Sequence, residues 1–160
     1  MDKHISYYRS PVGTLEISMI GDKVDRIAFC EDQQDIDPPA TMEMRSLFME
    51  LDAYFDGSLT TFKTPINLDG TEFERSVLHA LMTIPYGQTR SYKDIAKQIG
   101  NIQSVRAVGR ANGANRIPIL IPCHRVIGED GSLTGFAGGL EKKSWLLTHE
   151  GALAKQLSAF

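Results

Sequence analysis

Residues 4–30 alternate between short β-type runs and turn residues, which limits the start of the chain to a small antiparallel sheet. The runs HISYYRS, TLEISMI and VDRIAFC are separated by PVG and GDK. Runs of this length joined by short Gly-containing turns are typical of hairpins. A helix is predicted over residues 41–56, before Gly57. Its apolar side chains recur at helical spacing: Met44, Leu47, Phe48, Leu51 and Phe55.

A second module is predicted after a polar connection over residues 58–70. Thr71 with Glu74, and Ser91 with Asp94, have the spacing of capping boxes, which begin helices. A third helix is expected to begin at Gln103 or Ser104. Two short helices joined by residues 100–102 are typical of a helix-turn-helix, although ordinary helical hairpins have the same pattern.

These patterns predict an α/β (α+β) chain with two domains. Residues 1–68 are expected to form a three-stranded antiparallel sheet with one helix. Residues 69–160 are expected to form a helical, winged-helix-like domain with a helix-turn-helix.

The composition fits an ordinary globular protein, with 160 residues, 42% of them hydrophobic. Its 2 Cys residues exclude a disulfide scaffold. No apolar run reaches the roughly 18 residues of a membrane span, and the opening MDKHISYYRS has no basic region followed by an apolar one, so no secretory leader is expected. We therefore expect a cytoplasmic protein with reduced thiols and no membrane partner.

Charge is segregated along the chain. Residues 1–60 hold 5 Lys or Arg and 12 Asp or Glu, whereas residues 86–127 hold 7 Lys or Arg and 1 Asp. In the predicted third helix, Arg106, Arg110 and Gly113 share one face, with Gly109 beside them. A basic face with little side-chain bulk suits a widened DNA minor groove, and it equally suits close packing against another helix.

Cys123 has the sequence context of a reactive thiol. It lies in IPILIPCHRVIG, an apolar run between prolines that is predicted to be extended and irregular. A thiol is nucleophilic as the thiolate, and His124 and Arg125 offer a base and a positive charge. Glu150, at the end of the last predicted helix, can orient His124. Cys30 has no such neighbours and is predicted to be an apolar structural residue.

Several motifs in the second module resemble those of the methylated-DNA–protein-cysteine methyltransferases, also called 6-O-alkylguanine-DNA alkyltransferases. The resemblance is collinear from about Thr71 to Gly151, and its most specific motif is Pro-Cys-His-Arg-Val at residues 122–126. The other matching segments are Arg106-Ala-Val-Gly, Asn115, Gly135-Phe-Ala-Gly-Gly139 and Trp145-Leu-Leu-Thr-His-Glu-Gly151. The N-terminal module resembles the family's only in size and position.

The resemblance implies irreversible transfer of an alkyl group from O6 of guanine, and less readily from O4 of thymine, to a cysteine of the protein itself. By matching position, Cys123 is the acceptor in a single turnover. The resemblance implies that His124 acts through water as the base of Cys123, and that Glu150 orients His124. It also implies that Tyr92 crowds the 3′ phosphate of the target nucleotide and helps to protonate guanine N3.

The resemblance also implies the residues that contact DNA and the flipped base. Arg106 fills the gap that the flipped base leaves in the stack, and Asn115 ties the recognition helix to the active-site segment. Arg110 is expected to bind DNA through its charge. The pocket residues implied in this way are Cys123, Val126, Phe136 and Lys143. Phe136 departs from the tyrosine of many relatives, so it keeps an apolar wall without a hydrogen bond.

The partner implied is double-stranded DNA containing 6-O-alkylguanine, bound by a monomer without a cofactor. Some relatives hold zinc, but His4, Cys30 and His79 lack a convincing ligand spacing, so no metal is predicted. Three alternatives stay open. They are an alkyltransferase-like protein that flags lesions, in which the acceptor cysteine is replaced; a cysteine hydrolase; and a winged-helix regulator, in which Cys123 would be inert to iodoacetamide.

Overall fold

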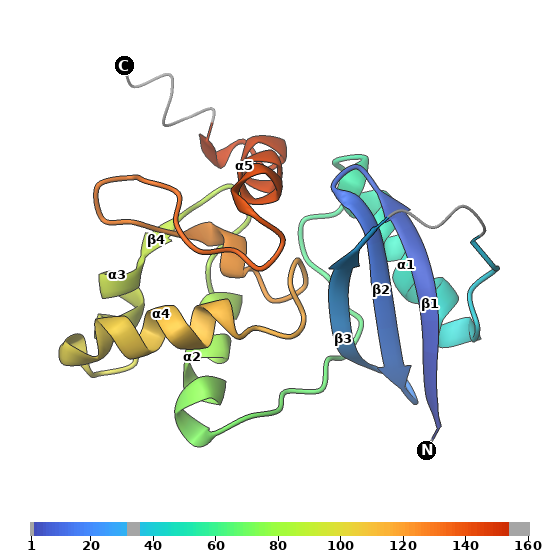
Figure 1. Ribbon diagram of the computed structural model, residues 1–160, viewed down its shortest axis with the longest axis horizontal. Coiled ribbons are helices and arrows are strands. Elements are labelled where there is room, and N and C mark those ends of the chain that lie inside the picture. The colour runs from blue at the N-terminus through green and yellow to red at the C-terminus, as the bar shows by residue number, and fades with distance from the viewer. Residues whose placement is uncertain (1, 32–35, 154–160) are drawn as a thin grey trace. The chain divides into compact units, whose positions relative to one another are not determined.

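The computed structural model describes residues 2–31 and 36–153. The chain divides into two compact units, Met1–Asn67 and Leu68–Phe160, which are described one at a time (Figure 1). Among the described residues, no helix has both the length and the apolar character that a membrane span requires.

The first unit is built on a three-stranded antiparallel meander. Strands β1 (Lys3–Ser10), β2 (Gly13–Ile20) and β3 (Lys23–Cys30) lie in the order β1-β2-β3. The first hairpin pairs Ser10 with Gly13, and the register of the second shifts between Ser18 and Met19. The central strand is the most buried, with Leu15 and Ile17 fully covered. The predicted meander is therefore confirmed.

Helix α1 (Met42–Phe55) packs its apolar face against this sheet (Figure 1). The side chain of Thr41 caps the helix by accepting a hydrogen bond from the Met44 amide at 3.0 Å. The ring of Tyr8 on β1 lies edge-on to Phe48, and its hydroxyl donates to Asp52 Oδ1 at 2.6 Å. Strand β1 and α1 are thus joined by both apolar and polar contacts.

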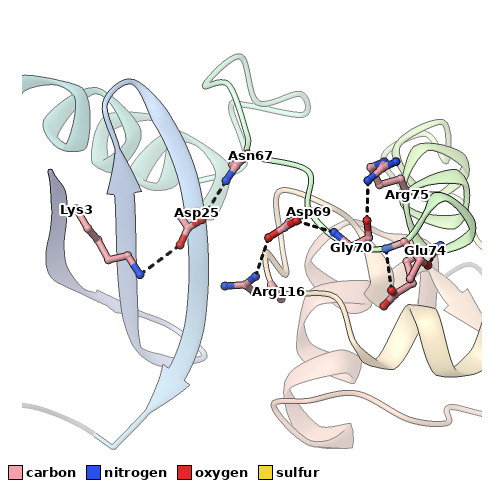
Figure 2. Close-up of polar contacts among 9 residues, drawn as sticks. Lys3, Asp25, Asn67, Asp69, Gly70, Glu74, Arg75 and Arg116 are labelled. Atoms are coloured by element: carbon pink, nitrogen blue, oxygen red, sulfur yellow. Dashed lines mark hydrogen bonds and ion pairs between the residues drawn. The ribbon is translucent and has the colours of Figure 1, made fainter. Parts of the chain in front are cut away.

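The connection after α1 also contributes to the sheet, which its polar sequence did not predict. The Val24 amide of β3 donates to Pro65 O at 2.9 Å, and the Asn67 amide donates to Val24 O at 2.8 Å. The buried carboxylate of Asp25 accepts a hydrogen bond from Asn67 Nδ2 and lies 3.6 Å from Lys3 Nζ (Figure 2). Backbone pairing along an open sheet edge requires no apolar side chains, so composition gave no signal for it.

The second unit is mainly helical. Helix α2 (Glu72–Met82) begins with the predicted capping box of Thr71 and Glu74. Helix α3 (Tyr92–Gln98) begins with the box of Ser91 and Asp94. A 3-10 turn over Ile102–Ser104 leads into helix α4 (Val105–Gly113), and the last helix is α5 (Leu140–His149). Strand β4 (Arg90–Ser91), which lies between α2 and α3 in the sequence, pairs in parallel with strand β5 (Val126–Ile127), which lies between α4 and α5.

Helices α3 and α4 form the predicted helix-turn-helix, and both pack on α2. Gly100 ends the first of these helices at a φ of 83°, a conformation that favours glycine. Val108, Ala111 and Asn112 form the buried side of α4, whereas Arg106, Arg110 and Gly113 are exposed. With the N-terminal sheet and this helical unit, the predicted fold class is confirmed.

Candidate active site

The segment before Cys123 is irregular, as predicted, but it forms a tight turn, so the prediction that it is extended was wrong. The Ile121 amide donates to Ile117 O at 3.0 Å, and Ile119 has a φ of 77°. Left-handed backbone is rare for a β-branched residue and costs about 1–3 kcal/mol. Apolar and polar residues do not alternate in this run, so this pattern gives no sign of a strand or of a turn. Hydrogen bonds from residues outside the run determine its shape.

Asn115 supplies those hydrogen bonds. Its Oδ1 accepts from the Ile117 amide at 3.0 Å, and its Nδ2 donates to Ile121 O at 2.9 Å. Both ends of the strained turn are therefore fastened to one buried side chain directly after α4. Asn112 of α4 adds a long contact from its Nδ2 to Cys123 O at 3.5 Å. Sequence reasoning missed Asn112, since it reads as an ordinary buried position of a helix.

Cys123 begins a 3-10 turn over Cys123–Arg125 and is 5% exposed. Burial raises the pKa of its thiol to about 11, against the effect of the Asn115 hydrogen bond and the positive charge of Lys143. The thiol is protonated at neutral pH in this state, and slow reaction with iodoacetamide is expected whatever the function. That reagent therefore cannot exclude a DNA-binding regulator.

His124 directly follows Cys123 in the sequence, and its side chain is fully buried. Its Nε2 lies 2.8 Å from Glu150 Oε2. Burial lowers the pKa of His124 although the carboxylate opposes this, so the imidazole is neutral near pH 7. A neutral ring that donates its Nε2 proton to Glu150 leaves Nδ1 unprotonated. Nδ1 has no hydrogen-bond partner within residues 2–31 and 36–153, and it can accept a proton.

Glu150 follows α5 and is held by two basic side chains. Arg125 Nε donates to Oε1 at 2.8 Å, and Nη2 donates to Oε2 at 3.0 Å. Burial alone would raise the pKa of Glu150, but the hydrogen bonds from His124 and Arg125 and the charge of Arg125 hold it well below its usual range. Arg125 also donates from Nη1 to Ile84 O at 2.7 Å. The predicted His124–Glu150 pair is present, with Arg125 as a further member.

The cation that favours the thiolate is Lys143, whereas the sequence suggested Arg125. Lys143 is fully buried on α5, and burial lowers its pKa to about 8 although Cys123 opposes this. Its Nζ donates to Thr134 O at 2.5 Å, and Tyr92 OH donates to the same carbonyl oxygen at 3.3 Å. Thr134 therefore links Tyr92 to Lys143. Sequence reasoning missed Thr134 because a loop threonine carries no pattern.

The other residues predicted for the site lie either in β5 and the loop that follows it or on α4. Val126 is buried at the start of β5, and Phe136 is half-buried in the loop between β5 and α5. Arg106 and Arg110 are exposed on α4. A methyl group on Gly109 would approach the Tyr92 ring at 3.9 Å, and one on Gly113 would meet nothing within 4 Å. Neither glycine is therefore needed to make room for a neighbouring helix: Gly113 is exposed, and Gly109 is half-buried beside Tyr92.

Comparison with known proteins matches both units to one family. Residues 3–68 match the model described as 6-O-methylguanine DNA methyltransferase, ribonuclease-like domain, and residues 72–152 match the DNA binding domain of the same protein. A relative from Methanosarcina acetivorans, named methylated-DNA–protein-cysteine methyltransferase, is 42% identical over 154 residues, 93% of this chain and 99% of the relative. One of the same name from Mycobacterium tuberculosis is 43% identical over 153 residues, 92% of each chain.

Solved structures from Mycobacterium tuberculosis agree with this match. Its O6-methylguanine methyltransferase superposes with a TM-score of 0.85 at 42% identity, over 94% of each chain. A structure of OGT from the same organism in complex with DNA gives 0.85 at 44% identity, over 93% of each chain. The N-terminal sheet, the helix-turn-helix and the Cys123 site occur here in one chain whose two units both match. This chain therefore belongs to the 6-O-methylguanine DNA methyltransferase family.

Proposed function

We propose that this protein repairs DNA by moving a methyl or larger alkyl group from O6 of guanine, and less readily from O4 of thymine, to Cys123. The observation that carries the proposal is the buried group of Cys123, His124, Glu150 and Arg125. A buried thiol beside a neutral imidazole, which is itself oriented by a carboxylate, suits proton removal followed by nucleophilic attack.

The reaction begins with proton removal from the thiol. A water passes the proton of Cys123 to Nδ1 of His124, and Glu150 stabilises the imidazolium that forms. Lys143 stabilises the thiolate. The sulfur then bonds to the alkyl carbon while the bond from that carbon to guanine O6 breaks, and its electron pair stays on guanine. Tyr92 donates a proton to guanine N3 as the base leaves.

The product explains why one turnover is expected. A thioether on Cys123 is not readily cleaved by water or by His124, so the nucleophile is consumed. A cysteine hydrolase would regenerate its thiol. The direct test is the number of alkyl groups that each protein molecule accepts from duplex DNA containing 6-O-methylguanine.

We assign DNA binding and catalysis to residues 69–160 and regard residues 1–68 as a separate domain. The described site residues lie between Ile84 and Glu150, within the segment that matches a DNA binding domain. The neighbouring structure with DNA supports duplex DNA as the partner. We further propose that the protein acts as a monomer in the cytoplasm, where Cys30 and Cys123 stay reduced and form no disulfide.

Arg106 is proposed to fill the stack when the target base is flipped. Arg106→Ala should lower transfer from duplex DNA about 10-fold to 100-fold, because extrusion of a base costs a few kcal/mol that the arginine offsets. Reaction with free 6-O-benzylguanine needs no extrusion and should change little. The matched control is Arg116→Ala, which removes another exposed arginine. Equal losses on both substrates would assign Arg106 to the chemistry or the fold.

Gly109 tests whether the small-residue face of α4 enters a DNA groove. Gly109→Ala should raise the free energy of unfolding by up to about 1 kcal/mol, because alanine favours helix and the added methyl makes only an ordinary contact with Tyr92. Affinity for duplex DNA should fall, since the methyl group would separate α4 from the groove. Denaturant unfolding and a DNA titration measure the two effects. Unchanged affinity would place this face outside the DNA interface.

A further inference from the structure

Thr134 holds the hydroxyl group of Tyr92 from two sides. Tyr92 begins α3, and Thr134 lies 42 residues later in the loop between β5 and α5. The Tyr92 OH donates to Thr134 O at 3.3 Å, and Thr134 Oγ1 donates to the Tyr92 oxygen at 3.1 Å. One loop residue therefore contacts both the proton and the oxygen of the phenol.

The direction of these hydrogen bonds follows from the chemistry of the groups. A carbonyl oxygen only accepts, so the single phenol proton points to Thr134 O. The hydroxyl proton of Thr134 must then point to the phenol oxygen. The bond to the carbonyl is longer than the usual 2.7–2.8 Å or so between hydroxyl and oxygen, so the Tyr92 proton is weakly held.

The surroundings keep this arrangement in place. Lys143 Nζ donates to the same carbonyl at 2.5 Å, which fixes the loop at Thr134. A methyl group on Gly135 would lie 3.9 Å from the Tyr92 oxygen, and one on Gly109 would lie 3.9 Å from its ring. The phenol is thus bounded by α4 on one side and by the loop on another. Lys143 already satisfies the carbonyl, so Tyr92 can give up its bond to it.

We propose that Thr134 is a positioning residue for alkyl transfer, which holds the Tyr92 phenol in place until its proton passes to the leaving guanine and stabilises the phenol oxygen through its own hydroxyl. This inference rests on the proposed function. When the Tyr92 O–H bond breaks, the proton bonds to guanine N3 and the electron pair stays on the phenol oxygen. A hydrogen bond donated to that oxygen favours its charged form. The proton taken from the Cys123 thiol later returns to Tyr92 through water, so protons balance.

The test compares four variants in single-turnover transfer from duplex DNA containing 6-O-methylguanine, at DNA concentrations that reach saturation. Thr134→Val keeps the side-chain shape and removes the donor. Thr134→Ser keeps the donor. Tyr92→Phe removes the phenol, and the fourth variant combines Tyr92→Phe with Thr134→Val. Thr148→Val on the exposed side of α5 is the matched control for loss of a threonine hydroxyl.

Thr134→Val should lower the saturated transfer rate about tenfold, the size expected for one hydrogen bond to a developing charge, with little change in the DNA concentration at half-saturation. Thr134→Ser should stay within about twofold of the wild type, below the contribution of such a bond. In the Tyr92→Phe background, Thr134→Val should have no further effect, because the oxygen it serves is absent.

Three outcomes would overturn the inference. They are an unchanged rate in Thr134→Val, a low rate in Thr134→Ser, or a further tenfold loss on adding Thr134→Val to Tyr92→Phe, which would show a purely structural role. If the wild type accepts no methyl group from the duplex, the proposed function fails and the inference fails with it. If the wild type accepts one group while Thr134→Val is unaffected, only the inference fails.

Discussion

Mixed with an excess of duplex DNA containing 6-O-methylguanine, the protein is expected to gain one methyl group and then stop. The physical reason is that the thiolate of Cys123 becomes a thioether, which has no easy route back to the thiol. Intact mass measurement should show the addition of a single CH2 unit. Peptide mapping should place it on the peptide that contains Cys123 and leave Cys30 unmodified.

The two cysteines provide matched controls for this experiment. Cys123→Ala should abolish transfer while DNA binding persists, because the variant only removes the sulfur atom of one small buried side chain. Cys30→Ala should transfer as the wild type does, since Cys30 lies at the end of β3 and its sulfur contacts Thr14 O. Continued turnover beyond one equivalent, or an adduct on Cys30, would contradict both the reaction and the assignment of its acceptor.

Glu150→Gln is expected to damage stability and transfer together. The glutamine keeps the size of the side chain but leaves the charge of buried Arg125 without a counter-charge. Breaking a buried ion pair in this way lowers the free energy of unfolding by about 3–5 kcal/mol. His124 also loses the carboxylate that stabilises its protonated form. General acid–base catalysis contributes about 10²-fold to 10⁴-fold, so weakening His124 as the base should lower the rate by up to that factor, which single-turnover transfer measures.

Acid unfolding gives an independent check on the same carboxylate. The pKa of Glu150 is lowered in the folded protein, so its contribution to stability is present above the ordinary Glu pKa and is lost as the pH falls through the folded value. Glu150→Gln cannot titrate and should lose this part of the acid sensitivity. An acid unfolding curve with the same slope as the wild type would mean that Glu150 is not ionised in the fold.

Two further variants separate the effect of the buried charges on stability from their effect on catalysis. Asp69→Asn removes an exposed ion pair, whose partner atoms Asp69 Oδ2 and Arg116 Nη1 lie 3.5 Å apart (Figure 2). It should change stability by less than about 1 kcal/mol. Arg125→Met combined with Glu150→Gln removes both buried charges, and should recover much of the stability but none of the transfer. Recovery of transfer would show that Glu150 acts only through folding.

The helices and strands could be predicted because their signals are local. The hairpin turns, the capping residues Thr71 and Ser91, and the apolar spacing of α1 and α2 all act over a few residues. Residues 58–70 illustrate the limit of such signals. Their pairing with Val24 is made by backbone groups, which every residue except proline offers equally, so no composition marks it.

The site shows the same division more sharply. The Pro-Cys-His-Arg-Val motif was enough to predict Cys123 and His124 as site residues and to propose the type of chemistry. It did not reveal that Arg125 would bind Glu150, 25 residues away, while Lys143 would supply the charge near the thiol. Both pairings depend on where α5 lies against the Cys123 turn, and that position is a result of packing.

The sequence by itself therefore determined the elements, their order, the candidate acceptor cysteine and the family resemblance, since each depends on neighbouring residues. Only the tertiary structure decided the strained turn at Ile119, the ionisation states of the buried groups and the contact of Thr134 with Tyr92. These depend on burial and on hydrogen bonds between residues distant in sequence. Burial raises the pKa of Cys123 and lowers that of His124, and the same two residues in water would have neither shift.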